Sequence, residues 1–196
     1  MDTPHAIGTT PGEALAPDEA LASRDLSPEE FRAAFRNHAA GVAVVTADPG
    51  DGPVGMTATS VFSVSATPPL LVFSVSELSS ATPGILRADS VVVHLLGSGQ
   101  AEIAKRFATS GIDRFEDPST WDRLPTGEPY LPAAHAWIRG TIVNRFTAGG
   151  STLVVVNATD ASYPEAGSAE ASAESARPLV YHNRTWHQLG EHSRIA

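Results

Sequence analysis

The chain has 196 residues, a formal net charge of −9 and no cysteine. This length suits one domain with a substantial core, and no apolar run approaches the roughly 18–20 residues of a membrane-spanning helix. The acidic charge argues against nucleic acid and anionic membranes as partners, and the lack of cysteine excludes disulfides, thiolate metal sites and cysteine nucleophiles.

Residues 1–24 mix proline, alanine, glycine and acidic residues without periodicity, which predicts a flexible leader. They lack the basic start and apolar stretch of a secretory signal, so we expect a soluble cytoplasmic protein. We place the folded domain at 25–190 and a short C-terminal tail at 191–196.

A helix is predicted directly after the leader. Ser27 is a candidate N-cap, Pro28 suits the first helical position, and Glu30 completes a capping box. An apolar stripe at helical spacing should dock on the rest of the domain, and it consists of Phe31, Ala34, Phe35 and His38. We expect Gly41 to end this helix.

Short strands separated by turns follow. Alternation and β-branched content predict strands at 42–46, 54–64, 70–76, 90–96, 134–146, 153–160 and 179–189, with a turn at 48–52. Helical segments are expected at 83–87 and 100–109, a long ordered loop at 111–132, and a mobile low-complexity segment at 161–177. Many strands and no β-α-β rhythm indicate a mostly β fold, an antiparallel barrel with a few flanking helices.

The segment 55–65 reads GMTATSVFSVS and alternates strictly if it is one strand. The hydroxyl side chains on one face would be Thr57, Thr59, Ser63 and Ser65. The opposite face would carry the apolar side chains of Met56, Ala58, Phe62 and Val64. Such a strand could present a flat ligand with hydroxyls and backbone, or it could simply expose a polar face to solvent.

From Phe31 to Leu189 the chain resembles the flavin reductase family, small FMN-binding split-barrel proteins that include reductase partners of two-component monooxygenases. Six stretches carry the resemblance through their order and spacing. They are HAAGVAVVT (38–46), GMTATSVFSVS (55–65), PPLLVFSV (68–75), SSAT (79–82), AKRFA (104–108) and PLVYH (178–182).

The resemblance implies an antiparallel, Greek-key-like split β-barrel that forms a homodimer. It implies an NAD(P)H-dependent flavin reductase, in which a hydride passes from nicotinamide to N5 of FMN, or alternatively of FAD. It also implies that reduced flavin is supplied to a partner monooxygenase. Since the flavin carries this chemistry, no catalytic acid or base and no metal site are expected.

The resemblance also implies which residues contact the flavin. Ring and ribityl contacts are expected from Thr57, Ala58, Thr59, Ser60, Ser74, Val75 and Ser76. Phosphate contacts are expected from Ser80 and Thr82, with Arg106 approaching the phosphate and Phe107 forming a pocket wall. The alternatives are turn capping for Ser80 and Thr82, and a solvated basic turn beside a core aromatic for Arg106 and Phe107.

Other motifs point away from rival functions. Gly97 and Gly99 follow a strand, but Glu102 replaces the third glycine of a dinucleotide fingerprint, so NAD(P)H should bind as an exchangeable second substrate. No G-x-S-x-G motif is present. His182 and His187 should point to opposite faces of one predicted strand, and His94 should be a hydrogen-bonded core residue.

The turn 149–151 departs from the family pattern. Most relatives carry Gly-Asp-His where this chain has Gly149, Gly150 and Ser151. Ser151 is therefore the candidate on the nicotinamide side, where relatives have a histidine. Two alternatives stay open: an FMN-binding protein with little NAD(P)H turnover, in which Ser151 marks the lost nicotinamide contact, or a split-barrel enzyme that uses another flavin-like ligand such as a deazaflavin.

Overall fold

The computed structural model describes residues 25–173 and 176–195, so the expected leader at 1–24 lies outside the described residues. The chain divides after Phe35 into two units, of which the second, residues 36–196, contains every strand found in the described residues. In the first unit, helix α1 spans Pro28–Phe35, and Phe31 and Phe35 contact each other with ring centroids 4.8 Å apart.

The start of α1 is the predicted capping box. Ser27 Oγ accepts a hydrogen bond from the Glu30 N–H at 3.2 Å, and Glu30 Oε2 accepts one from the Ser27 N–H at 2.9 Å. The predicted end is wrong, because Gly41 already lies in strand β1 and pairs with Val180.

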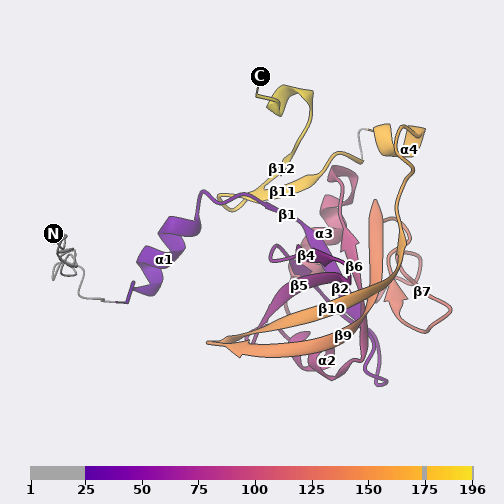
Figure 1. Cartoon of the computed structure of the whole chain (residues 1–196), viewed down its shortest axis with the longest axis horizontal. Coiled ribbons are helices and arrows are strands. Elements are labelled where there is room, and N and C mark those ends of the chain that lie inside the picture. The colour runs from indigo at the N-terminus through magenta and orange to yellow at the C-terminus, as the bar shows by residue number, and fades with distance from the viewer. Residues whose placement is uncertain (1–24, 174–175, 196) are drawn as a thin grey trace, which may run out of the picture. The chain divides into compact units, whose positions relative to one another are not determined.

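A seven-stranded antiparallel sheet forms most of the second unit (Figure 1). Its strand order is β3-β2-β6-β9-β10-β5-β4. The strands are β2 (Ala43–Ala47), β3 (Val54–Ala58), β4 (Phe62–Ala66), β5 (Pro69–Ser76), β6 (Ser90–Leu95), β9 (Ala136–Ala148) and β10 (Ser151–Ser162). The prediction of a mostly β, antiparallel fold is confirmed.

Smaller elements complete the second unit. A three-stranded sheet has the order β1-β11-β12, and β7 pairs with β8 inside the predicted loop 111–132. These strands are β1 (Ala40–Gly41), β7 (Asp122–Arg123), β8 (Pro129–Tyr130), β11 (Leu179–His182) and β12 (Thr185–Gln188). The helices are α2 (Thr82–Arg87), η2 (Ser98–Gln100), α3 (Ala101–Ala108), α4 (Ala169–Ser172) and η4 (Glu191–Ser193). No helix in the described part of the chain is long and apolar enough to cross a membrane.

The strand predicted at 54–64 is two strands, β3 and β4. The chain leaves β3 at residue 58, and residues 59–61 connect it to β4 at the opposite end of the strand order. The predicted single hydroxyl face is therefore wrong. Ala58 is buried in the core, whereas Phe62 and Val64, expected on its face, are more than half exposed.

The last predicted strand is a hairpin. Asn183 and Arg184 adopt left-handed backbone conformations with φ of 48° and 62°, which turn the chain between β11 and β12. His182 and His187 therefore lie on adjacent strands with ring centroids 5.6 Å apart, and the prediction that they point to opposite faces is wrong.

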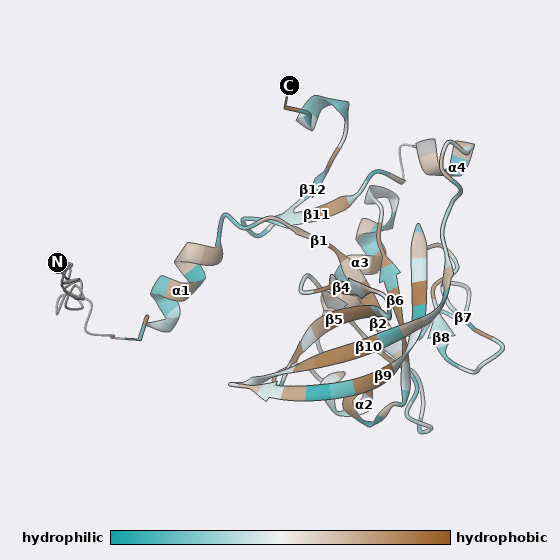
Figure 2. Cartoon of the chain, in the orientation of Figure 1, coloured by the Kyte–Doolittle hydropathy of each residue, from teal (hydrophilic) through white to brown (hydrophobic). Residues whose placement is uncertain are grey.

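Two apolar clusters lie on the two sides of β2, whose five residues are all buried. Val45 belongs to the cluster that contains Phe73 of β5, and Val44 belongs to the cluster that contains Phe107 of α3. Figure 2 shows the apolar character of the neighbouring strands β5 and β10. Helix α3 thus covers one side of the sheet, as its apolar residues predict.

His94 is the hydrogen-bonded core histidine that the sequence predicts. It is fully buried, its Nδ1 lies 3.0 Å from Val44 O, and its Nε2 lies 3.0 Å from Leu131 N. Because the backbone N–H of Leu131 is a donor, Nε2 accepts and Nδ1–H donates to Val44. Burial lowers the pKa of His94 to about 4, so the ring is neutral at pH 7.

Candidate functional site

The connection 59–61 is fixed to β5 by one serine. Ser60 Oγ accepts a hydrogen bond from the Ser74 N–H at 3.0 Å and lies 3.3 Å from Ser74 O, to which it donates. The sequence prediction placed Ser60 and Ser74 in one site, and the structure brings them together. Thr59, next to Ser60, is exposed.

A row of serine side chains lies on the outer face of β5 and β10. Ser74 and Ser76 alternate with core residues along β5, and Ser151 is the register partner of Ser76. All three are partly buried. Val75 and Ala58 instead belong to the buried core, so their side chains do not reach this face.

Exposed apolar side chains lie on the same face beside this row. Leu153 pairs with Ser74 on one side and with Phe146 on the other, while Phe62 pairs with Val72. Phe62 and Phe146 are 55% and 51% exposed. The face is therefore apolar with a polar stripe, which suits a flat aromatic ligand with polar edges.

The segment 79–82 follows the end of β5. Thr82 is buried, and its hydroxyl donates to Ser76 O at 2.6 Å, so its proton is already used within the protein. Ser80 is exposed and accepts a hydrogen bond from Arg114 Nη1 at 3.3 Å. Ser80 also lines a cavity of about 590 Å³, together with Arg87 and Trp121.

Arg114 is a residue of this region that the sequence analysis missed. Its Nη2 donates to Thr109 O at 2.9 Å, whereas its Nε is buried and has no hydrogen-bond partner among the described residues. Burial lowers the pKa of Arg114. The contact with Ser80 spans 34 positions in the sequence, and no motif spacing indicates it.

Arg106, which the resemblance placed near the phosphate, holds the loop that carries Arg114. Its Nε donates to Arg114 O at 3.0 Å and its Nη2 to Asp113 O at 3.2 Å, and Glu116 lies 3.6 Å away. Phe107 is buried and meets Phe115 edge-to-face at 5.2 Å. These two residues therefore connect α3 to the loop 109–121.

Thr57 has a similar role on β3. Its hydroxyl donates to the carbonyl of Ala104 in α3 at 2.6 Å. Among the predicted flavin contacts, Thr57, Arg106 and Phe107 thus lie at the α3 contact. The others whose side chains gather around the end of β5 are Ser60, Ser74, Ser76, Ser80 and Thr82.

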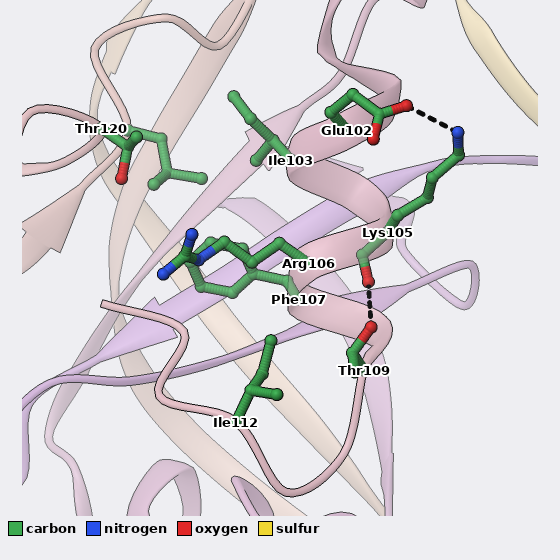
Figure 3. A pocket seen from close by; sticks show the side chains of 9 residues that line it. Glu102, Ile103, Lys105, Arg106, Phe107, Thr109, Ile112 and Thr120 are labelled. Atoms are coloured by element: carbon green, nitrogen blue, oxygen red, sulfur yellow. Dashed lines mark hydrogen bonds and ion pairs between the residues drawn. The ribbon is translucent and has the colours of Figure 1, made fainter. Parts of the chain in front are cut away.

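A second cavity, of about 410 Å³, lies beside α3, and its lining includes Ile103, Phe107 and Leu131 (Figure 3). Arg106 and Phe107 extend from the helix to the same side, between Ile103 and Ile112 (Figure 3). Lys105, the only lysine of the chain, forms an ion pair with Glu102 at 2.6 Å. Lys105 and Arg106 thus lie beside the buried Phe107, and the contact of Arg106 and Phe107 with a flavin stays a prediction.

The turn between β9 and β10 lies beside the end of β5. Gly149 has a left-handed φ of 58°, and Gly150 O accepts a hydrogen bond from the Glu77 N–H at 3.0 Å. A Cβ at Gly150 would lie 3.9 Å from Glu77 Oε2. An aspartate at 150 would therefore face the carboxylate of Glu77, so the absence of an acidic residue there fits its surroundings.

Comparison with known proteins gives one consistent result. Residues 35–190 match the model of the "Flavin reductase like domain". The chain is 40% identical over 189 residues to the "NADH:FMN oxidoreductase" of Rhodococcus erythropolis, an alignment that covers 95% of this chain and 96% of that protein.

Two further relatives extend this comparison. The crystal structure of a flavin reductase domain protein from Arthrobacter sp. FB24 superposes with a TM-score of 0.73 at 36% identity, over 82% of this chain and 94% of that one. The reductase component of a 4-nitrophenol monooxygenase from Rhodococcus opacus is 29% identical, over 80% of this chain and 78% of that protein.

Proposed function

The chain belongs to the flavin reductase-like family and is an oxidoreductase that acts on flavin, and on this premise we propose that it transfers a hydride from NAD(P)H to FMN. The family resemblance stated from the six sequence stretches is confirmed. The observation that carries the proposal is the serine row Ser74, Ser76 and Ser151, which lies in an exposed apolar face at the end of β5.

The residues of this face fit an isoalloxazine ring, which is flat, apolar on its two faces and polar at its edges. Ser60, Ser74 and Ser76 can hydrogen-bond its edge through hydroxyls or backbone, while apolar neighbours such as Phe62 and Leu153 can contact its faces. The flavin supplies the hydride acceptor at N5 when it is bound. The chain itself binds and orients the reactants, and no side-chain acid or base is needed.

NAD(P)H would bind as an exchangeable substrate on this face. Ser151 lies opposite Ser76 in the register, so it borders the serine row on the β10 side. A serine offers only a short hydroxyl there. Binding of the nicotinamide would then depend mainly on stacking against the flavin.

We propose that a second copy of this chain covers the apolar face and completes the flavin pocket. Phe62, Phe146 and Leu153 lie on the same face as the serine row, and they are too exposed to be part of a core. A flavin seated on Ser74 and Ser76 would therefore lie between two copies. Large exposed apolar patches of this kind mark interaction surfaces.

We also propose that the reduced flavin serves a separate monooxygenase. The supporting comparison is the Rhodococcus opacus protein, which is the reductase component of a monooxygenase. In such a system the reductase must release its reduced flavin. An open, partly exposed serine row is compatible with exchange of the flavin.

The test is flavin binding followed by anaerobic reduction. We expect FMN to bind the apo-protein with roughly micromolar or better affinity, about −8 kcal/mol, measured by quenching of flavin fluorescence. Anaerobic NADH or NADPH should then bleach the flavin absorbance. If FMN binds but neither nucleotide reduces it, the protein is a flavin-binding protein without reductase activity. If neither FMN nor FAD binds, the function proposed here is wrong.

A further inference from the structure

The hairpin of β11 and β12 brings two histidines together that one continuous strand would have kept apart. His182 ends β11, His187 lies on β12, and their ring centroids are 5.6 Å apart. In the strand register His182 faces Thr185, and His187 faces Val180. The two histidines are therefore diagonal neighbours on one face of the hairpin, at a separation that long side chains can bridge.

The ring nitrogens of this pair are available to a ligand. Neither ring makes a hydrogen bond or an ion pair with any residue in the described part of the chain. His94 differs, because both of its ring nitrogens are bonded to backbone groups. His187 is exposed and His182 is partly buried, so an ion can reach both rings from solvent. Imidazole nitrogens are preferred ligands of zinc, copper and nickel ions.

The opposite face of the hairpin holds the pair in place. Tyr181 and Trp186 contact each other with ring centroids 4.9 Å apart, and both pack on the buried cluster that contains Leu179. Because side chains alternate along each strand, His182 and His187 extend from the other face. The backbone that carries the two rings is therefore ordered before any ligand arrives, which lowers the entropic cost of binding.

The separation of the rings suits one shared metal ion. An ion about 2.0–2.1 Å from one nitrogen of each ring, at a tetrahedral angle, would hold the two ring centres about 5 Å apart. The centroids lie 5.6 Å apart, so a small rotation of the side chains is enough. The described residues offer no third histidine, aspartate or glutamate to such a site, so water must complete the coordination.

We propose that His182 and His187 bind one divalent transition-metal ion, such as Zn²⁺, and that this ion clips β11 to β12. The net charge of −9 favours the approach of a cation. The proposal differs from the sequence prediction, which expected no metal site, and it is independent of the proposed flavin function. Because the unfolded chain does not hold the two rings together, the ion should stabilise the folded protein.

Histidine variants of the untagged, chelator-treated full chain test the proposal. The wild type should bind one Zn²⁺ per chain, measured by competition with a chromophoric chelator. His182→Asn and His187→Asn should each raise the dissociation constant of Zn²⁺ at least about tenfold, because one of the two protein ligands is lost. His135→Asn is the matched control, since His135 lies outside the hairpin, and it should leave Zn²⁺ binding unchanged.

The double variant shows whether the two rings share one ion. If they do, His182→Asn combined with His187→Asn should bind Zn²⁺ no more weakly than either single variant. Zn²⁺ should raise the melting temperature of the wild type and of His135→Asn, but not that of the hairpin variants. If His182→Asn does not fold, His187→Asn, which changes an exposed side chain, decides alone. Wild-type binding that is absent at millimolar Zn²⁺, or unchanged in His187→Asn, would overturn the proposal.

Discussion

His94 shows how one buried polar residue ties stability to pH. Its neutral ring bridges Val44 O and the Leu131 N–H, and burial lowers its pKa to about 4 from an ordinary value of 6.5. The unfolded chain therefore binds a proton at a higher pH than the folded protein does. The stability that follows is complete above about pH 6.5 and is lost as the pH falls toward 4.

We predict that the wild type loses about 2 kcal/mol of unfolding free energy between pH 7.5 and pH 5 through this residue alone. Urea unfolding at several pH values measures the loss. His94→Gln, which keeps a donor and an acceptor but does not titrate, should show a flatter dependence. Glu128 contributes little in this range. Burial raises its pKa, hydrogen bonds from Arg139, Ser90 and Thr126 lower it to about 2, and both this value and the ordinary 4.5 lie below pH 5. Identical slopes for the two proteins would contradict this account.

Contacts between candidate site residues were predictable from the sequence only where the two residues lie close together along the chain. Ser60 and Ser74 lie 14 positions apart around one strand connection, and the resemblance assigned both to the site. The Arg114–Ser80 contact depends on the path of a loop with no periodic pattern, so nothing in the sequence indicates it. The resemblance placed Arg106 near the phosphate because the family has a basic residue at this position. In the structure Arg106 instead donates to the backbone of the loop that carries Arg114.

At the scale of elements, the packing of α3 on β3 depends on a glycine. A Cβ at Gly55 would lie 2.7 Å from Phe107 Cε1 and 3.1 Å from Val45 O, so the ring occupies the space that any other residue would fill. Thr57, two residues later on β3, anchors the same helix through the Ala104 carbonyl. The helix thus contacts β3 both through this close packing of Phe107 on Gly55 and through the Thr57 hydrogen bond.

We predict that Gly55→Ala lowers the free energy of unfolding by about 1–3 kcal/mol, because Phe107 or the helix must shift. Gly41→Ala is the control, since a Cβ at this other strand glycine meets nothing within 4 Å. Adding Phe107→Leu to Gly55→Ala should recover part of the loss, measured as a coupling free energy in urea. Strictly additive effects would show that the two positions do not compete for space.

The elements themselves were largely predictable, and the errors have a common physical cause. Three predicted elements agree with the structure, because alternation of apolar residues or a helix-start signal marks each of them. They are the predicted segments 70–76, 83–87 and 90–96, which correspond to β5, α2 and β6. The prediction failed at 59–61 and at 183–184, where the chain changes strands without a glycine or proline. Alternation continues across such places, so a pattern alone reads two strands as one.

At the scale of the whole molecule, the exposed apolar face of β4, β9 and β10 should set the oligomeric state. We predict that the wild type elutes with about twice the 20.5 kDa mass of one chain, measured by light scattering after size exclusion. Phe62→Glu combined with Phe146→Glu should give the single-chain mass and weaker flavin binding. Ile112→Glu, which changes an exposed apolar residue on another surface, should leave the mass unchanged. A monomeric wild type at micromolar concentration, or a dimeric double variant, would exclude this face as the interface.

The connection 59–61 has a consequence for how the protein folds. It joins β3 and β4, neighbours in sequence that occupy opposite ends of the strand order, so several pairings between them, such as β5 with β10, connect segments that are distant in sequence. Contacts between segments distant in sequence slow folding, because loop-closure entropy is lost before they form. Ser60 and Ser74 are only 14 positions apart, but the face they belong to is complete only when Ser151 of β10 pairs with Ser76 of β5, which lies 75 positions earlier (151 − 76). Recovery of flavin binding after dilution from urea should therefore lag behind the recovery of secondary structure.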